Sequence, residues 1–450
     1  MDLPLEILLI IFKNYVDTNP FTSKRSTGST KPHVFPVVFS PFQLMAVCRG
    51  WRSTVIALPE LWTNITLINC NPRTESLLTM YLERSAERPL SIVMFLCYDN
   101  PDYCLQTMNL LRSHAPRWQE IDFRFMDSYS TQVQILHAAD LHLPMLRKAT
   151  LSFHPEIVQG AEVFLKHVLS APALKSVTWI DGEDENGLTA SNGGFFQDAI
   201  SRQFPWAKLQ ELTLFSIVDM RALFNGLCAA RNLAYLSLDW HRDQPNPTNI
   251  FSSSREVILP ELVTLKIRSI PHPCVFNILR RFITPKLSDF ELMGVSTPSN
   301  RLNGRWNTTD LLHFFGRSGC RLTKFSCRYT PTSDGQNDSL QLLQSVYLER
   351  LSHLTLVIPK VTQEMMDALT RSETSPKEGV LLPELAYVKL RANVPVGAAL
   401  QFALSRRNGY KRLDVLDFTS NDNIEQGDRE KINMLEEAGT VVKFTTSKLC

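Results

Sequence analysis

The sequence predicts an α/β solenoid, in which one strand and one helix form a repeat that stacks on its neighbours. Apolar residues recur at relative positions 1, 4 and 6 of a short frame, as in Leu146, Ala149 and Leu151. The first five frames begin 28 residues apart, between Trp62 and Leu174. A proline often stands two residues before the frame, as Pro144 does. A fixed period of about 20–50 residues is typical of repeat architectures.

The frame describes one strand of each repeat. It begins at Trp62, Leu90, Trp118, Leu146, Leu174, Leu209, Leu233, Leu262, Leu287, Leu322, Leu351, Leu385 and Leu413. Because side chains alternate along a strand, positions 4 and 6 share one face, and positions 3, 5 and 7 share the other. We therefore expect positions 4 and 6 to face the core.

The segments between the frames have helical periodicity. Residues 76–84 and 156–170 place apolar side chains three and four residues apart, on one helical stripe. A single strand and helix cannot bury both apolar faces, so neighbouring repeats must stack, with parallel strands. The alternative, an ordinary α/β domain, would show irregular spacing.

The first 62 residues predict a separate helical domain, followed by the repeats over 63–450. Residues 3–12 are strongly apolar, and Pro4 and Glu6 suit the first turn of a helix. No basic leader precedes this run, so we do not interpret it as a signal peptide. Residues 17–39 are rich in Ser, Thr, Lys and Pro and predict an inserted loop. Ser40 and Gln43 then form a capping-box pattern that begins a second helix.

Composition excludes several classes of function. The net charge of +2 and the absence of a Lys/Arg run argue against a nucleic-acid partner. No apolar run reaches the roughly 18 residues that span a bilayer, so we expect no membrane insertion. The nine cysteines are odd in number and scattered. They indicate reduced thiols and a cytoplasmic and/or nuclear protein.

The sequence contains no recognisable catalytic or metal-binding motif. Phosphate-binding, dinucleotide-binding, zinc-protease and nucleophile-elbow patterns are all missing. Cys97 and Cys104, and likewise Cys320 and Cys327, are too far apart in sequence for a zinc knuckle. We expect no catalytic residue, no metal site and no cofactor.

The repeats resemble the leucine-rich repeat over about residues 59–450. That family forms a curved array with parallel strands on the concave face. It also places Asn or Cys three residues after the last strand leucine, where adjacent turns are tied by a ladder of hydrogen bonds. Only Cys70 and Asn421 fit this position, so the resemblance implies a degenerate array.

The N-terminal residues resemble the F-box. The matching pieces are Leu3-Pro4-Leu5-Glu6-Ile7-Leu8 with Ile11-Phe12, then Val47-Cys48-Arg49-Gly50-Trp51-Arg52, then Leu61-Trp62. They follow the family pattern LPxEIL–IF, V-C-[KR]-x-W-[RK] and LW, in that order. The insertion at residues 17–39 is a departure from that pattern.

The resemblance implies a non-catalytic, substrate-recognition subunit of a Skp–cullin–F-box type ubiquitin ligase. The F-box would dock a Skp-family adaptor, and through it a cullin–RING ligase, while the repeats would bind a target protein for ubiquitin-dependent degradation. The implied adaptor contacts are Leu3, Pro4, Ile7, Leu8, Ile11, Phe12, Leu44, Val47, Cys48 and Trp51. The alternative is an adaptor-independent scaffold for protein interactions, whose N-terminal helices only cap the array.

Positions 3, 5 and 7 of the C-terminal repeats carry many charges. The cations are Lys266, Arg268, Lys324, Arg328, Lys389 and Arg391. Asp289, Glu291 and Asp417 share the same face. One hypothesis is that these cations bind an acidic or phosphorylated segment of the target. The other is that Lys266–Glu291 and Lys324–Asp289 merely pair across strands on a solvated surface.

Overall fold

The computed structural model describes residues 4–18, 40–68, 70–96, 101–125, 141–153, 161–181, 204–215, 220–239, 256–268, 272–293, 308–328, 336–370, 381–406, 412–420 and 424–446. The chain divides into two compact units, an N-terminal unit (Met1–Pro205) and a C-terminal unit (Trp206–Cys450).

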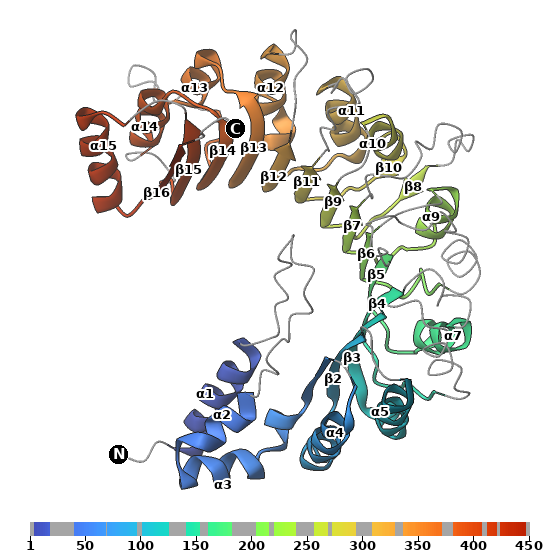
Figure 1. The fold of residues 1–450 in the computed structure, drawn as a ribbon. Coiled ribbons are helices and arrows are strands. Elements are labelled where there is room, and N and C mark those ends of the chain that lie inside the picture. The colour runs from blue at the N-terminus through green and yellow to red at the C-terminus, as the bar shows by residue number, and fades with distance from the viewer. Residues whose placement is uncertain are drawn as a thin grey trace. The chain divides into compact units, whose positions relative to one another are not determined.

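The N-terminal unit begins with three helices and continues as alternating helices and strands. Its helices are α1 (Leu5–Thr18), α2 (Ser40–Val47), α3 (Arg49–Ala57), α4 (Pro72–Arg84), α5 (Pro101–Ser113) and α7 (Glu162–Ser170), with the 3-10 turns η1 (Pro59–Trp62) and η2 (Ala115–Arg117). Its strands are β1 (Asn64–Ile68), β2 (Leu90–Leu96), β3 (Trp118–Phe125), β4 (Lys148–Phe153) and β5 (Ser176–Asp181). Each strand pairs in parallel with the next along the chain. Helices α4, α5 and α7 lie on one face of this sheet (Figure 1).

The C-terminal unit repeats the same arrangement. Its helices are α9 (Met220–Leu227), α10 (His272–Leu279), α11 (Thr308–Ser318), α12 (Gln336–Leu343), α13 (Gln363–Leu369), α14 (Val396–Ser405) and α15 (Gln426–Glu437), with the turn η4 (Val346–Leu348). Its main strands, in spatial order, are β6 (Glu211–Phe215), β7 (Tyr235–Asp239), β9 (Thr264–Arg268), β11 (Asp289–Met293), β12 (Lys324–Arg328), β13 (His353–Lys360), β14 (Tyr387–Asn393), β15 (Val415–Ser420) and β16 (Val441–Thr446). All of these neighbours pair in parallel. A short pair, β8 (Val257–Ile258) and β10 (Phe282–Ile283), forms a separate sheet.

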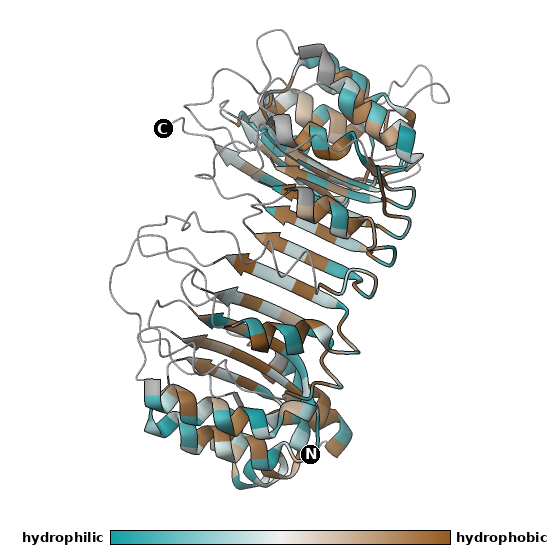
Figure 2. Ribbon diagram, turned by 90° about the vertical axis from the view of Figure 1, so that its right-hand side faces the viewer, coloured by the Kyte–Doolittle hydropathy of each residue, from teal (hydrophilic) through white to brown (hydrophobic). Residues whose placement is uncertain are grey.

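The repeating frame forms the core of both units. In every predicted frame except that of β2, the residues at positions 1, 4 and 6 are 6% exposed or less. Equivalent positions lie in register, so that Leu265 is the partner of both Leu236 and Phe290. The resulting bands of apolar and polar residues along the strands are visible in Figure 2. The predicted array of α/β repeats with parallel strands is therefore confirmed within each unit.

Strand β2 corrects the predicted frame. Val93 and Phe95 were expected to face the core, but they are half-buried, whereas Ile92 and Met94 are 0% and 1% exposed. The pairing of β2 with β3 is irregular between Leu90 and Ser91, where it skips one residue of β3. Because of this skip, the inward-facing residues of β2 that follow Leu90 are at positions 3 and 5 of the frame instead of positions 4 and 6.

The N-terminal helices also differ from the prediction. Helix α1 continues to Thr18, two residues into the predicted insertion, and residues 19–39 lie outside the described part. The second predicted helix is in fact two helices, because α2 ends at Val47. Cys48 has an extended backbone, and its Sγ accepts a hydrogen bond from the Trp51 amide at 3.4 Å, which caps the start of α3.

Both internal helices that the sequence predicted are present, with different starts. The first begins at Pro72 instead of residue 76, because the Asn71 side chain accepts bonds from the amides of Arg73 and Thr74. The second, α7, begins at Glu162. Residues 156–160 of its predicted range lie outside the described part.

Three arginines, two of them buried and Arg317 partly buried, join successive repeats at the edge where the strands begin. Arg117 donates to the carbonyl of Arg88 at 3.0 Å and to Ser85 Oγ at 2.6 Å. Arg317 donates to the carbonyls of Leu279, Arg280 and Phe282. Arg406, 3% exposed, donates to the carbonyls of Leu369, Leu381 and Leu382. These side chains satisfy carbonyl groups one repeat away and so tie neighbouring repeats together.

In the described part of the chain, no helix has both the length and the apolar composition that crossing a membrane requires.

Candidate functional site

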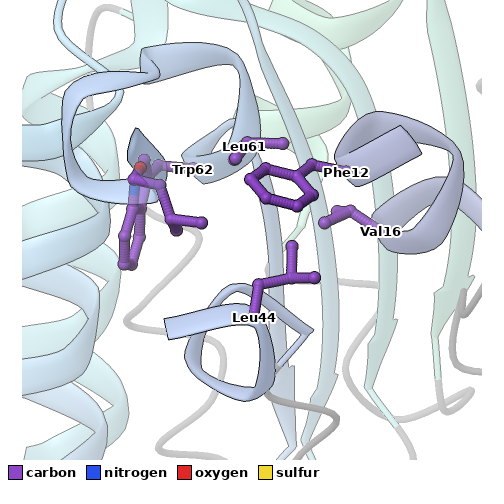
Figure 3. Packing of buried hydrophobic residues seen from close by; sticks show 6 residues of the cluster. Phe12, Val16, Leu44, Leu61 and Trp62 are labelled. Atoms are coloured by element: carbon purple, nitrogen blue, oxygen red, sulfur yellow. The ribbon is translucent and has the colours of Figure 1, made fainter. Parts of the chain in front are cut away.

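The helices α1, α2 and α3 pack around a small apolar core. Its buried members are Phe12, Val16, Leu44, Val55, Leu61 and Trp62. Figure 3 shows that Phe12 and Val16 from α1 point towards Leu44 from α2, with Leu61 beside them. The ring of Trp51 packs edge-on against Phe12, with centroids 4.7 Å apart. The Tyr15 hydroxyl donates to Gln43 Oε1 at 2.5 Å and so also joins α1 to α2.

This bundle shares its core with the first repeat. Trp62 is 0% exposed, and its Nε1 donates to the Val55 carbonyl at 2.9 Å. Its ring contacts Phe42 of α2 and Tyr81 of α4, with centroids 5.7 and 5.1 Å away. The Arg84 guanidinium lies 4.4 Å from the centre of the same ring. Burial raises the pKa of Tyr81 to about 12, so its phenol stays neutral at this junction.

The predicted adaptor contacts fall into three groups. Phe12 and Leu44 are buried at 0% and 5% exposure and pack in the core of the bundle. Leu8 and Trp51 are partly buried against the same core. The outward-facing residues are Pro4, Ile7, Ile11, Val47 and Cys48, whereas Leu3 lies outside the described residues.

The sequence interpretation missed three further exposed apolar residues. Leu5 and Ile10 are each 56% exposed, and Ile56 is 42% exposed. Together with Ile7, Ile11 and Val47, they form what we call the exposed apolar set. Ile7, Ile10 and Ile11 lie three and four residues apart, on a face of α1 away from Phe12. The sequence did contain a signal for this exposure. Residues 3–12 carry apolar side chains around most of the helix, and one short bundle cannot bury every side of it.

In the C-terminal unit, the face of the sheet opposite the helices carries the predicted cations. We call it the open face. On β9, Arg268 donates to both carboxylate oxygens of Glu291 on β11, at 2.7 and 3.1 Å. Lys266 lies 3.6 Å from the same carboxylate. The pKa of Arg268 is raised, chiefly by this hydrogen bond to Glu291.

The same arrangement recurs four strands further along the sheet. Asp417 on β15 lies 3.7 Å from Lys389 Nζ and 3.2 Å from Arg391 Nη2, both on β14. Arg391 also donates to Thr445 Oγ1 at 3.3 Å. The Asp417 side chain is only 8% exposed, so the acid forms the base of the group and the cations stand around it. Each group carries two cations and one acid, which leaves one net positive charge.

The remaining predicted cations, Lys324 and Arg328, lie on β12 between these groups, and both are exposed. Lys324 is the register partner of Asp289 and of His353. In the described residues, no ion pair joins Lys324 to Asp289, whereas the predicted Lys266–Glu291 pair is present. The His353 ring stacks on Tyr387, with centroids 5.6 Å apart.

The described residues contain no candidate metal cluster, and Cys320 and Cys327 are buried. No group of three or more His, Cys, Asp or Glu side chains there has the geometry to hold a metal ion. Cys320 and Cys327 are buried, and burial raises the pKa of Cys320 to about 11 and that of Cys327 further, so both are neutral thiols. Cys97 lies outside the described part.

Comparisons with known proteins do not assign a family. No protein-family model matches the chain. No curated protein matches its sequence either. Among solved structures, the chain is similar to a structural-genomics crystal structure of a Bacteroides fragilis protein, at 15% identity and a TM-score of 0.38. The match covers 62% of this chain and 67% of that one. A similarity this distant carries no argument about function.

Proposed function

We propose that this chain is the substrate-recognition subunit of a Skp–cullin–F-box type ubiquitin ligase. Its N-terminal bundle docks a Skp-family adaptor, and its leucine-rich-repeat-like strands bind the protein to be ubiquitinated. The chain contributes no catalytic residue, because the chemistry belongs to the rest of the ligase. The F-box pattern at residues 3–12, 47–52 and 61–62 supports this assignment.

One structural observation carries the proposal. The N-terminal bundle buries Phe12 and Leu44 yet leaves the exposed apolar set in solvent, with Val47 59% exposed and Ile11 44% exposed. Burying apolar surface yields about 25 cal/mol per Å², so such a surface favours a protein partner. The partner that the sequence pattern names is an adaptor of the Skp family.

The alternative is an adaptor-independent scaffold, in which the bundle only caps the array. The shared core of Trp62, Phe42 and Tyr81 is compatible with a cap. A cap, however, needs a polar outer face for solubility, and Ile7, Ile10 and Ile11 are exposed. We therefore favour adaptor docking.

Co-expression with a Skp-type adaptor tests the proposal. The wild-type chain is expected to retain the adaptor through purification. The double variant Ile7→Ser/Ile11→Ser should lose it, by at least about tenfold in affinity, because two apolar contacts are removed. Neither residue belongs to the buried core, so the variant should stay folded.

A matched control comes from exposed apolar residues elsewhere. Ile258 and Val263 in the C-terminal unit are 44% and 42% exposed. The variant Ile258→Ser/Val263→Ser should retain the adaptor fully. If the folded wild-type chain retains no adaptor, or if both double variants behave alike, the scaffold hypothesis replaces this one.

A further inference from the structure

The open face of the C-terminal unit contains a row in which arginines alternate with apolar residues. Consecutive register partners on five neighbouring strands are Arg268, Met293, Arg328, Val357 and Arg391. We call this set the arginine row. Figure 1 shows the five strands β9, β11, β12, β13 and β14 side by side in this order. The row therefore crosses the strands, with an arginine on every second one.

Two of the three arginines, Arg268 and Arg391, are held in place by acidic side chains on the neighbouring strand. Glu291 binds two guanidinium nitrogens of Arg268, and Asp417 binds Arg391. The side chains of Arg268 and Arg391 nevertheless remain 39% and 32% exposed. A guanidinium has five N–H donors, so the outward part of each can still bind a carboxylate. Because the acids already order these side chains, a ligand loses less conformational entropy on binding them.

The spacing of the row specifies the conformation of a ligand. Neighbouring strands lie about 4.8 Å apart, so successive arginines are separated by about 10 Å. A polyproline II segment repeats every three residues and rises about 9.3 Å over them, with every third side chain on one face. A β-strand presents side chains on one face about 6.6 or 13 Å apart, and neither distance fits.

From this match we propose that the arginine row binds an acidic protein segment in the polyproline II conformation, with a carboxylate at every third residue. The segment runs across the strands, and one carboxylate meets each arginine. Met293 and Val357 are partly exposed between the arginines and contact the segment's backbone and stems. The inference deepens the proposed function, on which it rests, by giving the chemistry of the target segment.

Charge complementarity favours a peptide over a nucleic acid. The row itself carries three cations and no acid, but Glu291, Asp289 and Asp417 lie on the same face in adjoining positions. A continuous phosphate backbone would meet these acids, whereas a segment with charges at fixed intervals would avoid them.

Fluorescence anisotropy with synthetic peptides tests the inference on the full-length chain. Three labelled peptides of equal length and composition place three aspartates at every second, every third or every seventh position; the last presents them on one face of a helix. We expect the every-third peptide to bind at least about tenfold more tightly than the others, and more weakly at high salt.

Replacing Arg328, the central arginine of the row, is the most direct test by mutation. Arg328→Gln should reduce binding of the every-third peptide to the level of the other two. Arg429→Gln is the matched control, because Arg429 is also exposed and lies on α15, away from the open face. It changes the net charge equally and should leave the preference intact.

Three results would overturn the inference. The first is equal binding of all three peptides, or of none. The second is a preference for the every-seventh peptide, which would mean a helical ligand. The third is binding of a single-stranded oligothymidylate that depends on Arg328 while no peptide binds. Adaptor retention is measured separately, so loss of peptide binding with the adaptor retained removes this inference alone.

Discussion

Three buried or partly buried arginines distinguish this array from a regular one. Arg117, Arg317 and Arg406 reach carbonyl groups one repeat away, and each is close to the end of a helix or a turn. The sequence did not predict these bonds. Arginine is usually a surface residue, and nothing in its local pattern signals that it will bond to distant backbone carbonyls.

Arg406 allows a direct test of this role. It is 3% exposed and donates to three carbonyls at 2.6–3.1 Å. Arg406→Met fills similar space but leaves those buried carbonyls without donors, so it should lower the free energy of unfolding by about 3 kcal/mol or more. Urea denaturation measures the change.

The exposed Arg429 provides the comparison for that measurement. Arg429→Met should change the unfolding free energy by less than about 0.5 kcal/mol, as surface substitutions usually do. Equal effects of the two substitutions would mean that Arg406 does not join the repeats.

Strand β2 shows how far the frame can be predicted for a single element. Residues 90–96 are apolar at almost every position, so the alternation that marks an inward face is absent from them. The period of 28 residues placed Val93 inward, and the irregular pairing with β3 moved Ile92 there. Elsewhere a polar residue separates positions 4 and 6, and the prediction was correct.

Substitutions in β2 distinguish the two frames. Ile92→Ala should cost about 2–4 kcal/mol, because it opens a cavity at a side chain that is 0% exposed. Val93→Ala, on the half-buried opposite face, should cost clearly less. Thermal unfolding of both variants decides the matter. A larger loss for Val93→Ala would restore the frame that the sequence predicted.

Strand β16 is an element that the frame did not find. Gly439 stands where the frame requires an apolar residue, because α15 ends there with a positive φ of 84°. The inward residues Val442 and Phe444 are only half-buried, since no described strand follows β16. A glycine that ends a helix thus replaced the apolar residue on which the prediction depended.

Across the molecule, the sequence predicted the architecture better than the sites. The repeat and its parallel strands follow from a periodic pattern that recurs in both units. The open face of the six cations was also predictable, because strand alternation fixes it. Which acidic residues pair with these cations depends on side-chain geometry, since Glu291 alone pairs with both Lys266 and Arg268. The sequence also did not reveal which side of α1 faces the core, because apolar residues surround this helix.

We predict that the C-terminal repeats and the N-terminal bundle unfold independently of each other. In a repeat array, each repeat contacts only its neighbours, so destabilisation stays local. Leu236 is 0% exposed in β7, whereas the bundle core extends no further along the chain than Tyr81. Leu236→Ala should therefore cost about 2–5 kcal/mol in the C-terminal unit and leave adaptor retention unchanged.

Hydrogen–deuterium exchange combined with the adaptor assay checks this outcome. Exchange should accelerate in β6, β7 and β9 and stay constant in α1, α2 and α3. Thr213→Ala, on the half-buried face of β6, is the control and should change neither measurement; Ser237 would not serve, because its side chain is only 4% exposed. If Leu236→Ala also weakens adaptor retention, the N-terminal bundle and the repeats unfold as one cooperative body.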